Sequence, residues 1–232
     1  MRTRRPGNST AGRWGRVLRT FERGVAAVAR QSPVACLIVC ISWLGGCVVG
    51  QSVPVGYTPT PSTTTATGAA VAVTVRDERP YVTSGDKPAD FLGTYRAAIG
   101  VPWDVTTKGK QPLAALFETH IAVELRSLGY AVVPRPDALR VLDVAIQDWN
   151  FDAYLNGSIW YELSASVLSP DGTELARSHI KESQLTKGNF WTTGGKAGVE
   201  AAMPDVYAGA IRKLVRDNPE ISAALSGGTA AP

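Results

Sequence analysis

The first 46 residues differ so much from the rest that they limit which part of the chain can form a folded domain. Residues 1–32 contain eight arginines and one acidic residue, Glu22. An apolar run of 13 residues, Val34 to Gly46, follows and ends at Cys47. This run is shorter than the roughly 20 residues of a membrane-spanning helix. A basic segment, a short apolar run and small residues before a cleavage point characterise a secretory signal peptide. The sequence therefore predicts that residues 1–46 are removed on export.

The end of the apolar run carries a more specific signal. Leu44, Gly45, Gly46 and Cys47 resemble the lipobox of bacterial lipoproteins. The resemblance implies that the mature chain begins at Cys47 and that this residue carries a diacylglycerol anchor and palmitate. The residue after the cysteine is Val48. An Asp at this position would have resembled an inner-membrane retention signal. We therefore expect the protein to be located at the periplasmic face of the outer membrane. An uncleaved N-terminal anchor helix is the alternative.

Removing the signal changes the charge and the cysteine content. Residues 1–46 hold eight of the 24 basic residues and one of the 20 acidic ones, so the remainder has 16 basic and 19 acidic residues, a net charge of −3. A nucleic-acid partner is not expected, because it requires a clustered basic face. Cys36 and Cys40 lie in the apolar run, so the mature chain keeps only Cys47 and must be held together by packing without an internal disulfide.

Composition divides the exported chain into three parts. Residues 47–70 hold the candidate lipidated cysteine and a Ser/Thr/Pro-rich stretch without hydrophobic period. This composition predicts a disordered tether. A tether of this length would hold the domain on the order of 25 Å from the lipid. Residues 71–217 have the length of a single globular domain. Residues 218–232 are predicted to be a mostly flexible tail.

Hydrophobic periodicity predicts the elements of the domain. Residues 71–75 alternate as a strand, and residues 81–111 show little period. Three longer strands are expected at 139–154, 158–169 and 173–187, with an Asn156-Gly157 hairpin and a bulge near Gln147 or Asp148. Two helices are expected, and their apolar stripes comprise Leu113, Leu116, Phe117, Ile121, Leu125 and Leu128 in the first and Ala202, Val206, Ala210, Ile211 and Leu214 in the second. The predicted fold is α+β, a mainly antiparallel sheet of four to five strands with two amphipathic helices packed on one face.

This order of elements resembles the YajG-like bacterial lipoproteins. The matching features are Cys47, a first strand that leads into Asp77-x-Arg79, a helix closed by Gly129-Tyr130, a central hairpin and a C-terminal amphipathic helix. The layout is also similar to auxiliary lipoproteins of lipid transport and to the lipopolysaccharide-assembly lipoprotein. The resemblance implies a small envelope domain anchored to lipid, without an established catalytic site.

The residues themselves do not assemble a catalytic motif. His120 falls on the apolar side of a helix, and Ser178 and His179 are adjacent in a strand, so their side chains point to opposite faces. Neither a metal site nor a cofactor is predicted, and we expect a protein that is not an enzyme. The competing hypothesis is an envelope hydrolase that uses Asp148 and Asp152, which share one face of a strand.

Aromatic residues give the better functional signal. Trp103, Trp149, Trp160, Phe190 and Trp191 fall on predicted loops or on the less apolar face of strands, and exposed aromatic residues mark contact surfaces. Burial of these rings under the loops 81–111 and 188–198 is the alternative. The candidate partner-contact residues are Asp77, Arg79, Trp103, Trp160, Phe190 and Trp191. The expected function is therefore a non-catalytic envelope module that binds a protein or an amphiphile.

Overall fold

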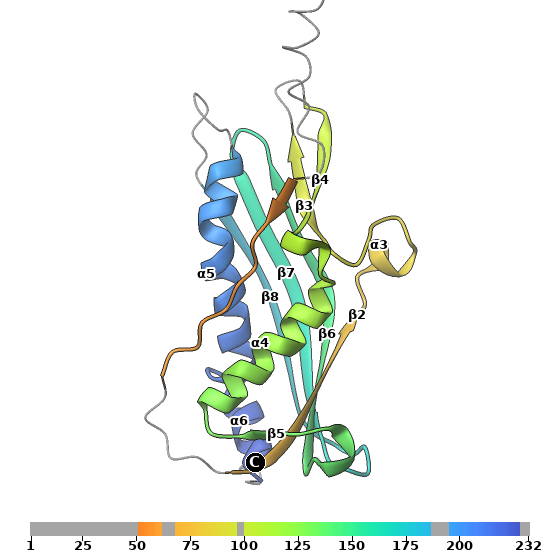
Figure 1. The fold of residues 1–232 in the computed structure, drawn as a ribbon, viewed down its shortest axis with the longest axis vertical. Coiled ribbons are helices and arrows are strands. Elements are labelled where there is room, and N and C mark those ends of the chain that lie inside the picture. The colour runs from red at the N-terminus through yellow and green to blue at the C-terminus, as the bar shows by residue number, and fades with distance from the viewer. Residues whose placement is uncertain (1–50, 62–67, 97–99, 187–194, 228–232) are drawn as a thin grey trace, which may run out of the picture. The chain divides into compact units, whose positions relative to one another are not determined.

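A computed structural model describes residues 51–61, 68–96, 100–186 and 195–227. Its strands belong to one eight-stranded sheet, and the longer helices pack on one face of that sheet (Figure 1). The strands are β1 (Gln51–Val53), β2 (Ala70–Asp77), β3 (Phe91–Arg96), β4 (Pro102–Thr107), β5 (Ala131–Val132), β6 (Arg140–Ala153), β7 (Gly157–Leu168) and β8 (Glu174–Thr186). The helices are α3 (Pro80–Thr83), α4 (Leu113–Ser127), α5 (Gly195–Val215) and α6 (Pro219–Leu225), with 3₁₀ turns η1 (Lys108–Lys110) and η2 (Arg135–Asp137).

Strand β6 organises the sheet. One of its edges pairs with β7 along almost its whole length, and β7 continues to β8, all antiparallel. The other edge is shared by two strands, since β2 pairs in parallel with residues 140–146 and β3 pairs in parallel with residues 152–153. Beyond these, β5 is parallel to β2, β4 is antiparallel to β3, and β1 is parallel to β4.

The predicted fold class is therefore only partly right. The domain is α+β, but the sheet is mixed rather than mainly antiparallel, and it has eight strands instead of four to five. The hairpins were visible in the sequence because turn residues mark them locally. The parallel pairs join segments that are far apart in the chain, and no local pattern identifies such partners.

The expected bulge is confirmed. The β6–β7 register shifts between Ile146 and Asp148, which leaves Gln147 as the extra residue. Because of this shift, Trp149 and Phe151 lie on the same face as Leu142 and Ile146, and all four are fully buried.

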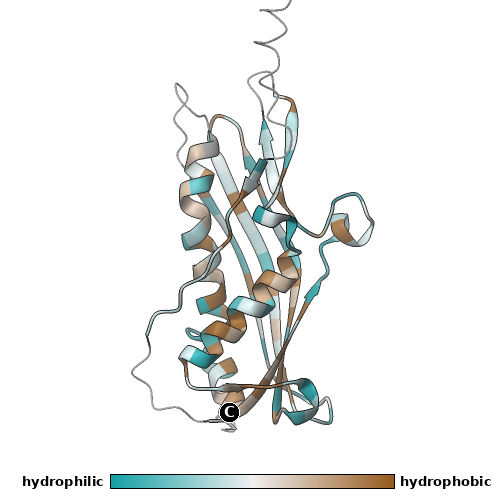
Figure 2. Cartoon of the chain, viewed as in Figure 1, coloured by the Kyte–Doolittle hydropathy of each residue, from teal (hydrophilic) through white to brown (hydrophobic). Residues whose placement is uncertain are grey.

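The core lies between this face and the helices. In α4, Leu113, Phe117, Ile121 and Leu125 are fully buried, whereas Leu116 is half-buried. Figure 2 shows hydrophobic and hydrophilic residues alternating along α4 and α5, as expected for helices with one buried face. The predicted stripe of α5 is confirmed by the burial of Val206, Ala210, Ile211 and Leu214.

Aromatic rings fill the centre of the core. Trp149 stacks on Tyr161 with ring centroids 5.3 Å apart, and it meets Phe117 and Tyr207 edge-on. His120 Nδ1 lies 2.9 Å from the Tyr207 hydroxyl oxygen, and burial lowers the pKa of His120. His120 is half-buried, which agrees with its expected place on the apolar side of the helix.

The N-terminal segment differs from its prediction as a tether. Residues 51–53 form β1, and Val53 is buried in the core. The Tyr57 hydroxyl donates a hydrogen bond of 2.6 Å to Glu124 Oε2, and Arg216 Nη2 donates to the Thr60 carbonyl oxygen at 2.7 Å. Since Glu124 is fully buried and also accepts from Arg216 Nε at 2.6 Å, these bonds fix the segment to α4 and to the residue that follows α5. The ordered fold thus starts well before residue 71.

Two further segments are more ordered than predicted. Residues 81–111, expected to be irregular, contain most of α3 and all of β3 and β4. Residues 219–225, expected in a flexible tail, form α6, which the Asn218 side chain caps by accepting from the Ile221 N–H at 3.1 Å. Ile221 and Leu225 are buried, so α6 belongs to the core. Within the described ranges, no helix is both long enough and apolar enough to span a membrane.

Candidate interaction surface

The sheet face opposite the helices, called the open face below, is centred on Trp160. In β7, Ile159, Tyr161 and Leu163 are buried beneath the helices, and Ser158, Trp160 and Glu162 are half-buried on the other face. The register places Trp160 between Asn150 of β6 and Ser183 of β8. The sequence prediction that Trp160 faces away from the core agrees with this arrangement.

Trp160 is held in place by a carboxylate. Its Nε1 donates a hydrogen bond of 3.0 Å to Asp148 Oδ2, and the Tyr81 hydroxyl lies 2.9 Å from Asp148 Oδ1 and 2.8 Å from the Trp149 carbonyl oxygen. Burial and the neighbouring Asp148 carboxylate raise the pKa of Tyr81, so this hydroxyl stays protonated and donates. The indole is therefore held in one orientation by these hydrogen bonds.

The charged side chains nearest to Trp160 on the open face are paired. Arg96 contacts both carboxylate oxygens of Asp152, at 2.6 to 2.9 Å. Glu162 accepts from Lys181 at 2.6 Å and lies 3.0 Å from His179 Nε2, and these two contacts lower the pKa of Glu162. Exposed pairs of this kind add little stability. Their consequence is a face that carries charge of both signs without a strong excess of either.

A shallow, open hollow surrounds Trp160 where β3, β6 and β7 meet. We call it the Trp160 hollow. It is lined by Arg96, Gly100, Asp152, Tyr154, Asn156, Ser158 and Trp160. It combines one fixed aromatic ring with an ion pair and with amide and hydroxyl groups. Such a mixture is typical of a protein contact site, where an aromatic anchor is surrounded by a polar rim.

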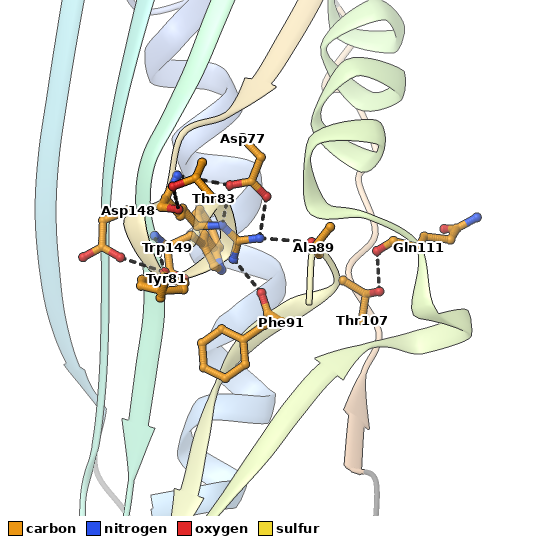
Figure 3. A network of polar contacts seen from close by, with 10 residues as sticks. Asp77, Tyr81, Thr83, Ala89, Phe91, Thr107, Gln111, Asp148 and Trp149 are labelled. Carbon is orange, nitrogen blue, oxygen red and sulfur yellow. Dashed lines mark hydrogen bonds and ion pairs between the residues drawn. The ribbon is translucent and has the colours of Figure 1, made fainter. Parts of the chain in front are cut away.

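Asp77, at the end of β2, is half-buried and lies beside Ala89 and Phe91, where the chain enters β3 (Figure 3). Arg79 bridges these two segments. Arg79 is fully buried, and its Nε and Nη2 contact the two Asp77 carboxylate oxygens at 2.8 and 2.7 Å. Nη1 donates to the Phe91 carbonyl oxygen at 2.6 Å and Nη2 to that of Ala89 at 3.0 Å. The pair therefore joins the two strands that share the edge of β6. A partner contact would need Arg79 at the surface.

The sequence reasoning missed Tyr81. It follows Arg79 by two residues, and the Arg79 guanidinium lies 5.6 Å from its ring centroid. Its hydrogen bond to Asp148 links the buried pair indirectly to Trp160. The only available signal was an aromatic residue just after a signature-like pair, and its partner is 67 positions away in the chain.

The other candidate residues do not join this surface. Trp103 pairs with Tyr95, which contacts Phe151 in the core, so Trp103 lies on the face opposite to Trp160. Trp149 is fully buried. Phe190, Trp191 and the predicted lipidation motif of Leu44, Gly45, Gly46 and Cys47 lie outside the described residues.

The proposed carboxylate pair is not assembled either. Asp148 and Asp152 are four positions apart on β6, a separation of about 13 Å in an extended strand, whereas the carboxyls of glycosidases lie roughly 5–10 Å apart. Each also has its own partner, as described above. Ser178 Oγ accepts from Asn218 Nδ2 at 2.7 Å, and neighbouring His179 contacts Glu162. Among the described residues, no group of three or more His, Cys, Asp or Glu side chains could hold a metal ion.

No protein-family model and no curated protein matches this sequence. Solved structures do resemble it. A Xanthomonas campestris protein assigned to the DUF330 family is 15% identical, with a TM-score of 0.52, over 77% of this chain and 96% of that protein. A PelC dodecamer variant from Paraburkholderia phytofirmans (12% identity, TM-score 0.40, 73% and 96% covered) is more distant. So is a minor lipoprotein from Acinetobacter baumannii (10% identity, TM-score 0.36, 72% and 100% covered). The likeness to the Xanthomonas protein shows a shared fold.

Proposed function

We propose that this chain is a cell-envelope lipoprotein, anchored through Cys47, that binds an envelope partner protein through the Trp160 hollow and has no catalytic role. The anchor is proposed from the signal-like N-terminus and the Leu44–Cys47 motif, and the periplasmic face of the outer membrane from Val48. Membership of the YajG-like group is part of this proposal.

The observation that supports the binding role is the fixed, half-buried indole of Trp160 on the open face. Large aromatic side chains that are held rigid lose little conformational entropy on contact, and tryptophan is enriched among the residues that dominate binding energy. The paired charges around it form a polar rim. The same groups favour binding over catalysis, because the carboxylates considered for hydrolysis are engaged in separate contacts.

A test uses the full-length protein in its native membrane. A photo-crosslinking residue at Ser158, in the Trp160 hollow, is compared with the same residue at Glu118, an exposed position on α4. We expect a discrete adduct from position 158 that is absent at 118 and is lost when Trp160→Ala is added. Equal adducts at both positions, or an adduct unaffected by Trp160→Ala, would refute the hollow as the contact site.

The alternative, an accessory lipoprotein of lipid or lipopolysaccharide transport, requires an apolar groove between helices and sheet. In the described part of the chain, that interface is filled by core side chains. The concave region beside α4 is lined by six small or apolar residues and by Glu118, Thr119, Arg126 and Arg135. It is open, and three of its residues are charged, which does not favour a buried acyl chain, so we prefer a protein partner.

A further inference from the structure

The entry point of the chain determines which end of the domain is nearest to the anchor. β1 runs parallel to β4, with Gln51 beside Val105, so the chain enters from the end of the sheet where β4 begins (Figure 1). Three residues, 48–50, separate Cys47 from Gln51. Even fully extended, these four peptide steps span at most about 14 Å. A lipid on Cys47 would therefore hold this end close to the bilayer, not about 25 Å away as the tether prediction implied.

The attachment also resists being pulled away. Pairing with β4, burial of Val53, the Tyr57–Glu124 hydrogen bond and the Arg216–Thr60 hydrogen bond fix residues 51–60 to the domain. Lengthening the connection would require breaking these contacts one after another, starting with β1. The short spacing is thus a property of the folded domain.

The same end of the sheet exposes apolar side chains. It contains the start of β4, the end of β3, the β6–β7 turn and the end of β8, which follow from the strand directions and registers. Its exposed apolar side chains are Val101 (41%), Tyr154 (39%), Leu155 (46%) and Leu185 (80%). The two other large apolar side chains exposed in the described residues, Leu139 and Leu175, lie at the opposite end.

We infer that this end of the domain docks on the lipid bilayer, with Val101, Leu155 and Leu185 entering its interfacial region. The inference rests on the proposed lipid anchor, because the anchor brings the bilayer within reach of this end. Exposed apolar groups that reach the headgroup and acyl boundary are stabilised by leaving water. The neighbouring Arg96 is neutralised by Asp152, so we expect docking to be driven by apolar contact and to need no anionic lipid.

Strand β8 provides a matched pair of positions for the test. Leu185 and Leu175 are both exposed leucines, ten residues apart, which is about 33 Å along a strand. Cys47 is the only cysteine after residue 46, and lipid would block its thiol. A cysteine introduced as Leu185→Cys or Leu175→Cys can therefore be labelled alone with an environment-sensitive fluorophore. Leu155→Cys provides a second position at the docked end.

The full-length processed protein is reconstituted into phosphatidylcholine vesicles, with and without lipids that carry a quencher at shallow depth. We expect blue-shifted emission and quenching for the probe at 185 and at 155, and water-like, unquenched emission at 175. Water-like emission at 185 and 155 from protein that floats with the vesicles would overturn the docking and leave the anchor intact. Protein that does not float with vesicles at all would instead refute the proposed lipoprotein function. A requirement for anionic lipid would contradict the apolar mechanism.

Discussion

At the residue scale, two arginines separated by two residues have opposite roles. Arg79 is fully buried and holds Asp77 and two strand carbonyls, whereas Arg76 is about half exposed and pairs with Asp143 and Glu78. Removing one partner of a buried pair leaves the other charge without its counter-ion, so Arg79→Ala should lower the free energy of unfolding by about 3–5 kcal/mol. Arg76→Ala should cost at most about 1 kcal/mol. Chemical denaturation of the two variants checks this, and equal losses would contradict the structural role of Arg79.

The leucine and tryptophan of β7 provide a second residue-scale prediction. Leu163 is fully buried, so Leu163→Ala should cost about 2–5 kcal/mol, the usual range for a truncated core leucine. Trp160→Ala should cost less, because the ring is half-exposed on the open face. Leu116→Ala should also cost less than Leu163→Ala, since Leu116 is only half-buried. Thermal melts of the three variants rank their losses of stability. A loss for Trp160→Ala as large as that for Leu163→Ala would make the indole part of the core.

At the element scale, the approach of β3 to β6 depends on one glycine. A Cβ at Gly93 would lie 2.5 Å from the Phe151 ring and 2.6 Å from the Phe151 carbonyl oxygen. Gly93→Ala must therefore displace a strand, and we expect a loss of at least about 1–3 kcal/mol in the free energy of unfolding. Gly209→Ala in α5 is the matched control, because nothing lies within 4 Å of its Cβ and alanine favours a helix. Denaturation midpoints that move equally for both variants would show that β3 does not pack this closely.

The elements also show how far the sequence could predict the structure. The Asn156-Gly157 hairpin, the bulge at Gln147 and the helical stripes were predictable because each is encoded within a few neighbouring residues. β1 was not, since a three-residue strand has no measurable period and its anchoring residues, Val53 and Tyr57, attach singly to distant partners. The mixed sheet was missed for the same reason.

The candidate site was predicted to a similar extent. Alternation along β7 was enough to place Trp160 on the outer face. The hydrogen bonds that orient it come from Asp148 and Tyr81, on two other segments, and only the folded chain brings them together. The burial of Arg79 could not be predicted either, because the sequence indicates that Asp77 and Arg79 can pair but not whether the pair is exposed to water.

At the scale of the whole molecule, the segment 51–60 connects the proposed anchor to the domain, and Glu124 is its central contact. Glu124→Ala would leave the half-buried Tyr57 and Arg216 without their carboxylate partner. We expect a loss of about 3–5 kcal/mol and earlier proteolysis between residues 51 and 61. Limited proteolysis with mass analysis of the products checks the order of cleavage. An unchanged cleavage pattern would mean that other contacts hold the segment.

The most direct test of the account is the intact mass of the protein purified from its native membranes. We predict a chain that begins at Cys47 and carries a diacylglyceryl group and fatty acid, and we predict that Cys47→Ser abolishes this species. A mature protein that retains residues 1–46, or that begins elsewhere without lipid, would contradict the account.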